Sequence, residues 1–157
     1  MQDTWLEALG GMVYGMYVLT AAVDGRIGGM IASWVSQVSY DPPLISVAVH
    51  PHRFTHTLIQ DSGGFALHVL AGDQVDFLSR FKGPEAKAKF EGLTWRHGLT
   101  GSPVLEDCVA YLECRVHTIL APGNHTLFLG EIVDAGRVRE ERPLCTLDYR
   151  GMYLGKE

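Results

Sequence analysis

Short, mainly apolar runs separated by turn residues occupy the first third of the chain, a pattern that is typical of β-strands. Residues 15–23 are rich in β-formers and precede Asp24-Gly25, a pair that predicts a type I′ hairpin turn. Residues 27–39 then read as one long strand. Asp41-Pro42-Pro43 predicts a corner, because proline cannot donate a ladder hydrogen bond. Residues 44–49, L-I-S-V-A-V, predict a fully buried strand.

Helical spacing of apolar residues replaces these strand-like runs in the middle third. Residues 53–61 place Phe54, Leu58 and Ile59 on one side of a predicted helix that ends at 62–64, S-G-G. Residues 73–81 predict a second amphipathic helix with Asp73 as N-cap, and residues 84–90 a third, short one. A further short helix is predicted at residues 3–11.

The remaining segments predict strands joined by short turns. Residues 65–71 follow the first central helix, and residues 108–120 alternate and pair through P-G-N-H with residues 126–133. Residues 144–154 predict a last strand. Seven or eight strands with few helices favour an antiparallel barrel or sandwich over a doubly wound α/β sheet, so we expect one mainly β domain over residues 1–157.

Composition and charge narrow the choice of function. The 157 residues are 46% hydrophobic and 20% charged, as in an ordinary globular protein, and no apolar run approaches the length that spans a bilayer. The net charge of −5 argues against nucleic acid as the main partner, because binding phosphates along a strand needs a basic surface. The acidic N-terminal segment lacks the basic region of a signal peptide, so we expect a cytoplasmic protein without membrane contact.

Several familiar catalytic motifs are missing from the sequence. There is no G-x-G-x-x-G, no G-x-x-x-x-G-K-[ST] and no G-x-S-x-G. The three cysteines form no C-x-x-C pair, and the histidines at 50, 52 and 56 have no acidic neighbour in a metal-binding spacing. Neither a zinc site nor a disulfide framework is predicted.

The most informative stretch is residues 27–44, which carries Ser33, Trp34, Gln37 and Ser39 within a strand-like pattern. A hydroxyl or amide that is buried without a partner costs about 1–3 kcal/mol, so these groups should be paired by the protein or by a ligand. A planar ligand with a polyol and a phosphate would satisfy such a set.

A phosphate site is suggested by the next segment. Arg53, Thr55 and His56 lie at the expected N-terminus of a helix, where backbone N–H groups and the helix dipole favour an anion. Lys89 could approach the same anion from another side. The residues alone fit equally a helix cap at Thr55, a solvated Arg53 and an exposed Lys89.

Two aromatic residues stand out in the same way. His125 follows Gly123-Asn124 in a predicted hairpin turn, and Trp34 lies in the serine-rich strand. His125 is well placed to touch a ligand at a barrel rim, and Trp34 could form the wall against a planar ring. A turn histidine and a core tryptophan explain the same positions.

Taken together, these segments resemble the flavin reductase-like family of FMN-binding split barrels, and among them the flavoredoxins and the flavin domain of high-molecular-weight rubredoxins. The resemblance covers about residues 8–154 and is carried by Y-G-M-Y-V-L-T, G-M-I-A-S-W-V-S-Q-V-S-Y-D-P-P-L, R-F-T-H-T-L-I, S-G-G-F-A-L-H-V-L, K-F-E-G-L, G-S-P-V-L-E-D-C-V-A-Y-L-E-C and G-N-H-T-L-F-L-G-E-I-V. One departure is Gly28-Gly29, where some flavoredoxins have an asparagine.

The resemblance implies an antiparallel split β-barrel of Greek-key type with a few short helices, which forms a homodimer with FMN near the subunit interface. It implies that residues at one end of the site line the isoalloxazine and ribityl chain, namely Ser33, Trp34, Val35 and Ser39. It places Arg53, Thr55, His56 and Lys89 at the phosphate, His125 near the flavin ring or the nicotinamide as the catalytic residue, and Tyr153 at the rim.

The leading hypothesis is therefore an NAD(P)H-dependent flavin reductase that passes a hydride through bound FMN, with no metal. A flavoredoxin-type electron carrier reduced by a partner protein explains more simply why no nucleotide-binding fingerprint is present. A split barrel that binds a flavin or another ligand without turnover is the third hypothesis.

Overall fold

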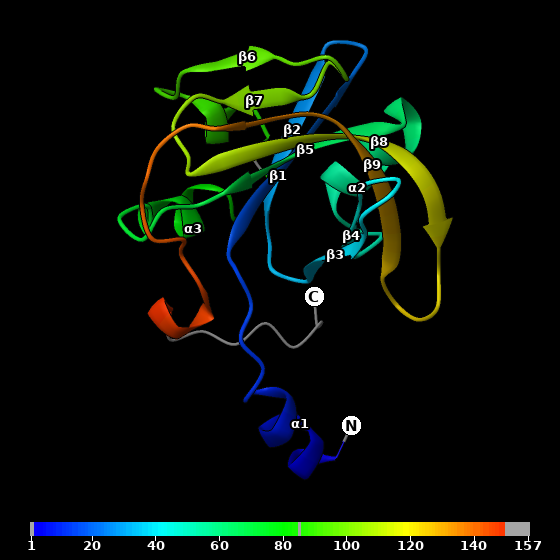
Figure 1. Ribbon diagram of the computed structural model, residues 1–157, viewed down its shortest axis with the longest axis vertical. Coiled ribbons are helices and arrows are strands. Elements are labelled where there is room, and N and C mark those ends of the chain that lie inside the picture. The colour runs from blue at the N-terminus through cyan, green and yellow to red at the C-terminus, as the bar shows by residue number, and fades with distance from the viewer. Residues whose placement is uncertain (1, 85, 150–157) are drawn as a thin grey trace.

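The computed structural model describes residues 2–84 and 86–149, and these are organised around one antiparallel sheet of seven strands (Figure 1). Neighbouring strands follow the order β2-β1-β5-β8-β9-β4-β3. The predicted antiparallel barrel with few helices is confirmed. The strands are β1 (Tyr17–Val23), β2 (Arg26–Ala32), β3 (Val35–Ser39), β4 (Leu44–Val49), β5 (Gly64–Val69), β8 (Ala110–Leu120) and β9 (Thr126–Arg137).

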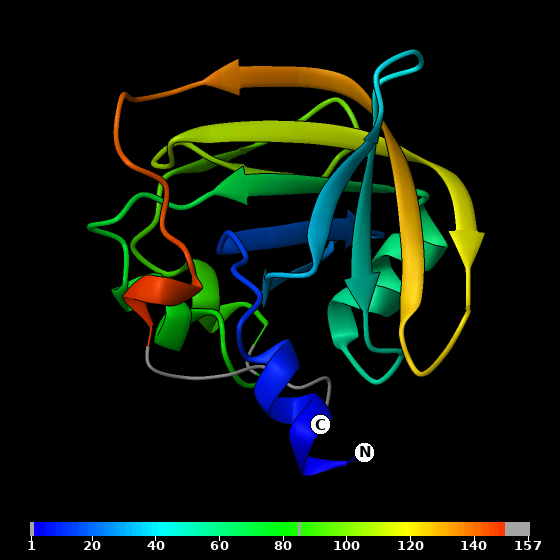
Figure 2. The ribbon, with the colours of Figure 1, turned by 60° about the horizontal axis from the view of Figure 1, so that its bottom comes forward.

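The long strand expected over residues 27–39 is wrong, because the chain breaks at Ser33-Trp34 into β2 and β3. These two strands lie at opposite ends of the strand order, so the break carries the chain from one edge of the sheet to the other. Figure 2 shows how the sheet curls: β9 bends sharply, and its first half runs beside β4 at a steep angle to β5 and β1. The two edges are thereby joined through the connection at Ser33-Trp34.

Local sequence signals account for the first hairpin. Asp24 and Gly25 both have positive φ, 49° and 75°, as a type I′ turn requires. β1 and β2 are paired without a shift from Tyr17↔Ala32 to Val23↔Arg26. β4 alternates between buried and half-buried residues, so its expected full burial is wrong: one face of this strand is turned away from the core.

Two of the four predicted helices are found close to their expected places. These are α1 (Asp3–Leu9) and α2 (Phe54–Ser62), and α2 ends at Gly63 with a left-handed φ of 70°. The helix expected over residues 73–81 is shorter, α3 (Asp76–Arg80), and its N-cap is Val75 rather than Asp73. The segment expected as a third central helix contains only the single-turn η1 (Ala88–Phe90).

Three short elements complete the described fold. β6 (Trp95–His97) and β7 (Pro103–Leu105) form a small two-stranded sheet that the sequence pattern did not predict. The strand expected over residues 144–154 is wrong where it can be checked, because it holds the helical turn η2 (Thr146–Asp148). Residues 150–154 lie outside the described part of the chain.

The core consists of two apolar clusters, one on each side of β1. Phe65 and Phe128 belong to the first, where Leu58 and Ile59 of α2 pack into the curled sheet. Phe81 and Phe90 belong to the second, which lies under α3 and η1. The pocket described next opens where β2, α2 and the α3–η1 region meet.

Candidate flavin site

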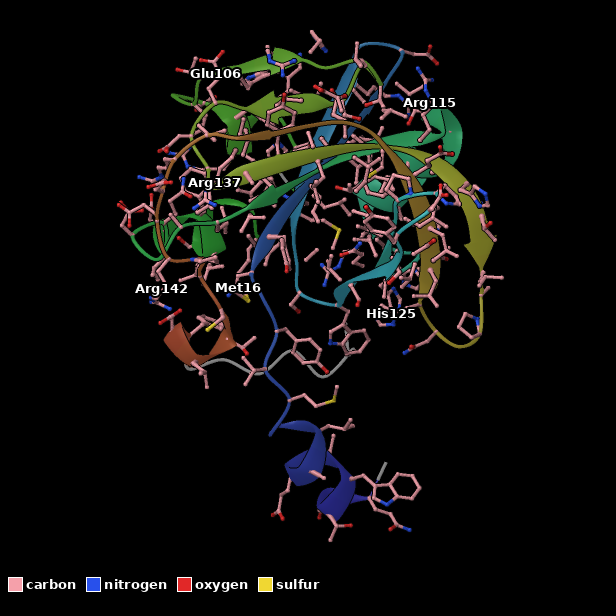
Figure 3. The ribbon with its side chains drawn as sticks, viewed as in Figure 1. Met16, Glu106, Arg115, His125, Arg137 and Arg142 are labelled. Atoms are coloured by element: carbon pink, nitrogen blue, oxygen red, sulfur yellow. The ribbon has the colours of Figure 1, made fainter. Side chains whose placement is uncertain are left out.

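A pocket of about 670 Å³ lies between the Ser33-Trp34 break, the start of α2 and the segment that follows α3. Its volume falls within the range of about 300–1,000 Å³ that is usual for small-molecule sites. Figure 3 shows Met16, one of its lining residues, on the lower side of the barrel, the side toward which α1 projects. The pocket is lined by Met16, Gly29, Met30, Ile31, Ala32, Ser33, Trp34, Ala48, His52, Arg53, Phe54, Thr55, Phe81, Lys82, Gly83, Pro84, Ala86, Lys89 and Tyr149.

Two cations from distant parts of the chain line this pocket together. Arg53 is the N-cap residue at the start of α2, and its side chain makes no capping hydrogen bond. Lys89 comes from η1 and is buried, with only 9% of its surface exposed. Thr55, in the first turn of α2, lines the same pocket and is buried. Two of the alternative roles left by the sequence, a cap at Thr55 and an exposed Lys89, are therefore wrong, whereas the third is confirmed: Arg53 is exposed to solvent.

The Lys89 ammonium donates a hydrogen bond to the backbone carbonyl oxygen of Gly29 at 2.9 Å. Burial lowers the pKa of Lys89, and the positive charge of Arg53 lowers it further. Within residues 2–84 and 86–149, neither cation forms a salt bridge with a carboxylate. A buried cation without a counter-ion is unfavourable, so this end of the pocket is prepared for an anion.

The opposite wall is formed where the chain crosses from β2 to β3. The backbone carbonyl of Trp34 accepts a hydrogen bond from the Ala48 N–H at 3.0 Å, which ties the crossing to β4. Ser33 is buried and lines the pocket, and its hydroxyl makes no hydrogen bond within the described residues. The Trp34 indole thus offers a fixed aromatic surface beside a hydroxyl, which suits a planar ring that carries polar edges.

His125 lies behind this wall. Its ring centroid is 4.8 Å from that of Trp34 and 5.2 Å from that of His50, and it is 7% exposed. Figure 3 places His125 on the lower side of the barrel, near β3 and the turn between β8 and β9. Burial lowers the pKa of His125, and the neighbouring His50 and Arg53 lower it further, which favours the neutral form of the ring.

The structure brings five of the sequence-predicted residues to the pocket wall, which are Ser33, Trp34, Arg53, Thr55 and Lys89. Four others, Val35, Ser39, His56 and His125, are not part of this wall. Val35 faces Val47 in the β3–β4 ladder, and Ser39 lies at the far end of β3, opposite Leu44. His125 is separated from the pocket by its contact with Trp34.

His56 is directed to the protein rather than to the pocket. Its Nε2 is 2.8 Å from the Thr126 hydroxyl, its ring packs 5.1 Å from Phe128, and it does not line the pocket. Successive helix residues are about 100° apart, and only Thr55 of this pair can point to the pocket. The remaining predicted residue, Tyr153, lies outside the described residues.

Sequence reasoning missed a second group of pocket residues. Lys82 donates a hydrogen bond from Nζ to the Tyr149 hydroxyl at 2.8 Å, and its ammonium lies 4.9 Å from the centre of the same ring. Both residues line the pocket, as do Met16 and Met30. A modest group of basic residues from Arg80 to Lys89 is visible in the sequence, but nothing in the pattern links it to Tyr149.

Two further features of the described residues bear on other classes of site. They contain no group of histidine, cysteine, aspartate and glutamate side chains that could hold a metal ion. None of their helices has the length and apolar composition needed to cross a membrane.

Comparison with known proteins identifies the family. Residues 9–155 match the model of the flavin reductase like domain. The chain is 36% identical over 156 residues to a ferric-chelate reductase (NAD(P)H) of Archaeoglobus fulgidus, covering 96% of this chain and 92% of the relative. It is 31% identical over 153 residues to the high molecular weight rubredoxin of Moorella thermoacetica, covering 95% and 67%.

A solved structure agrees with these relatives. The crystal structure of BorF, the flavin reductase component of a bacterial two-component tryptophan halogenase, superposes with a TM-score of 0.82 at 28% identity, covering 92% of each chain. The predicted resemblance is confirmed, and the chain belongs to the flavin reductase-like family of oxidoreductases.

Proposed function

We propose that this chain is an NAD(P)H-dependent flavin reductase that holds FMN in the pocket between Trp34 and the Arg53–Lys89 pair. The observation that carries this proposal is the pair of cations, one of them buried, that line one end of the pocket without a carboxylate partner in the described residues. A phosphate monoester is the anion that such a site suits, because it accepts hydrogen bonds on several oxygens.

The residues present fit the flavin mononucleotide from end to end. Arg53, Thr55 and Lys89 would hold the phosphate at the first turn of α2, and the Ser33 hydroxyl would meet the polar chain or ring edge. Trp34 would cover one side of the planar ring. FMN is favoured over FAD because the cationic end of the pocket provides for a terminal phosphate, and we propose this choice on that ground.

When bound, the flavin supplies the redox chemistry: it accepts a hydride, two electrons and one proton, from NAD(P)H, which leaves as NAD(P)⁺, and then yields the electrons to an acceptor. The chain's own part is to bind, to orient and to exclude water. Arg53 and Lys89 anchor the flavin at one end, and Trp34 fixes the plane of its ring, so that the nicotinamide meets one defined face.

The nicotinamide site and the acceptor follow from the relatives by analogy. The Archaeoglobus fulgidus relative is named for NAD(P)H and a ferric chelate, and BorF is named as one component of a two-component halogenase. We propose that this chain likewise takes NAD(P)H and delivers electrons beyond itself, to free flavin, a metal complex or a partner protein.

We also propose a homodimer and a cytoplasmic location. The support for a dimer is the outward helix α1, which buries none of its side chains within the chain and leaves Trp5 58% exposed (Figure 1). A seven-residue helix has little stability alone, so contact with a second copy would stabilise it. Size-exclusion chromatography with light scattering measures this directly, and a monomer at micromolar concentration would overturn it.

The activity is tested by following NADH and NADPH oxidation with FMN, FAD or riboflavin added to the purified protein. The proposal predicts turnover that requires both the protein and a flavin and that is most efficient, in kcat/KM, with FMN. Oxidation no faster than in the protein-free mixture would overturn it. A kcat/KM with riboflavin equal to that with FMN would show that Arg53 and Lys89 do not bind the phosphate.

A further inference from the structure

Lys89 lies in η1, a helical turn of only three residues, and a single turn has little stability of its own. On its apolar side Phe90 packs between Phe81 and Trp95, with ring centroids 5.6 and 5.7 Å away. Apolar packing is non-directional, so it holds the turn against the core without fixing the direction in which the neighbouring lysine points. A hydrogen bond from outside the turn can fix that direction.

Arg80, the last residue of α3, makes such a contact. Its Nη1 donates hydrogen bonds to the backbone carbonyl oxygens of Glu91 at 2.7 Å and of Lys89 at 3.4 Å. Among residues 2–84 and 86–149, no backbone N–H donates to either of these carbonyls. The guanidinium therefore caps the C-terminal end of the turn, as basic side chains do at the ends of helices.

The short helix that carries Arg80 is itself anchored in the core. Phe77 and Leu78 of α3 are buried and belong to the second apolar cluster. Arg80 lines a neighbouring groove of about 420 Å³, whereas Lys89 lines both that groove and the flavin pocket. Arg80 thus reaches the flavin pocket through Lys89.

The lysine is held at both of its ends. Arg80 ties its backbone to α3, and its own Nζ donates to the Gly29 carbonyl of β2 at 2.9 Å. A cation that is already ordered loses less side-chain entropy when it binds an anion, so it binds that anion more tightly than a mobile cation does. Fixing the turn therefore has a consequence for ligand affinity.

We propose that Arg80 is a positioning residue for the flavin phosphate, which fixes the backbone of η1 so that the Lys89 ammonium is ordered at the phosphate end of the pocket before the flavin binds. The effect on the flavin rests on the proposed function, because it assigns the anion at Lys89 to the phosphate of FMN. The tie between Arg80 and the turn does not, and it can be tested without flavin.

The first experiment is fluorescence titration of Arg80→Met with FMN and with riboflavin, in the wild-type background and in a Lys89→Gln background. Methionine keeps the apolar stem of Arg80 and removes its donors. The matched control is Arg26→Met, which removes a different half-exposed arginine whose Nη2 lies 3.7 Å from the Asp61 carboxylate.

Arg80→Met should lower the affinity for FMN about fivefold, the effect of one ordinary hydrogen bond, and that for riboflavin less than about twofold. In the Lys89→Gln background the same substitution should change the affinity for FMN less than about twofold, because no ammonium is left to position. Arg26→Met should bind both flavins like the wild type. An unchanged affinity for FMN in Arg80→Met would overturn the proposal, as would an equal loss for both flavins. An FMN loss that persists without Lys89 would also overturn it, because Arg80 would then act by its own charge or contact.

The second experiment uses flavin-free protein and compares the rates at which acetic anhydride modifies Lys89 and the exposed Lys87, resolved by mass spectrometry. The ratio of Lys89 to Lys87 modification should rise about fivefold in Arg80→Met and stay unchanged in Arg26→Met. An unchanged ratio in Arg80→Met would show that Arg80 does not order Lys89. If the wild type binds FMN no more tightly than riboflavin, the proposed phosphate site fails, while the labelling ratio still decides the role of Arg80.

Discussion

Lys89 donates a hydrogen bond from Nζ to the backbone carbonyl of Gly29, 2.9 Å away and 60 residues earlier in the chain. The acceptor is a peptide oxygen and not a carboxylate. The hydrogen bond therefore fixes the position of the ammonium without neutralising its positive charge. Gly29 also lies in close contact with the aromatic cluster below this segment. A Cβ at this position would lie 2.8 Å from Phe81, which packs beneath Lys89's segment.

Lys89→Gln should lower the affinity for FMN by about 10–100-fold, the usual effect of losing a charge-assisted hydrogen bond. The affinity for riboflavin, which has no phosphate, should change less than threefold. Lys87→Gln is the matched control, because Lys87 is exposed and does not line the pocket. Fluorescence titration of each variant with both flavins measures the effect. An equal loss for FMN and riboflavin would show that Lys89 does not bind the phosphate.

Trp34→Leu should lower the affinity for FMN and for riboflavin equally, unlike Lys89→Gln, which should affect FMN alone. Stacking on an aromatic ring contributes about 0.5–1.5 kcal/mol, so the expected loss is about 2–12-fold for each flavin. Trp5→Leu is the control, because Trp5 is 58% exposed on α1 and lies away from the pocket. The same fluorescence titrations measure this effect. A Trp34→Leu protein that binds riboflavin as tightly as the wild type would show that the Trp34 indole does not contact the flavin ring.

Gly29→Ala should destabilise the fold by about 1–3 kcal/mol, because the added Cβ meets Phe81 at 2.8 Å and Phe90 at 3.2 Å. It should also weaken FMN binding, since the carbonyl that holds Lys89 would shift. Gly123→Ala is the control, with open space around its Cβ. Urea unfolding gives the free energy of unfolding for each protein, and a Gly29→Ala protein as stable as the control would contradict the close approach.

Acid should destabilise the protein through His68, which is fully buried. Its Nδ1 donates to the Val18 carbonyl and its Nε2 accepts from the Leu105 N–H, each at 3.0 Å. Burial lowers the pKa of His68 to about 4 from about 6.5. The unfolded chain therefore binds a proton that the folded chain does not, and stability falls as the pH drops from about 6.5 to 4.

The loss assigned to this histidine is about 3 kcal/mol, given roughly 1.4 kcal/mol for each pKa unit. It is measured by urea unfolding of the wild type and His68→Gln at pH 7, 6, 5 and 4. The variant starts less stable, and its stability should fall less steeply over this range by about that amount. Parallel curves for the two proteins would contradict the assignment.

How far the sequence predicts this fold depends on how local the signal is. The Asp24-Gly25 turn and the α2 end at Gly63 follow from residues beside them in the chain, and both are found as expected. The break at Ser33-Trp34 could not be predicted, because both sides alternate like a strand and only the curl of the sheet separates them. The turn η2 (Thr146–Asp148) was missed for a similar reason: its Asp148 accepts a hydrogen bond from the Cys145 N–H and binds Arg142, in a segment that reads as a strand.

The candidate site shows the same division. Arg53 and Thr55 could be placed at an anion site because a helix start is visible in the sequence. Lys89 could be suggested for the same anion, but its burial could not be predicted from its neighbours in the chain. That His56 turns to Thr126 depends on a partner 70 residues later, which no local pattern reveals. The contact of Lys82 with Tyr149, across 67 residues, is equally long-range.

The most direct test of the central claim is anaerobic reduction of the protein-bound FMN in a single turnover, followed by the loss of its yellow absorbance. With wild-type protein, FMN should bind and be bleached by NADH or NADPH at a rate that saturates with nicotinamide and that far exceeds the rate in free solution. Protein that binds no FMN, or bound FMN that is bleached only by a chemical reductant or a partner protein, would contradict the proposed reductase.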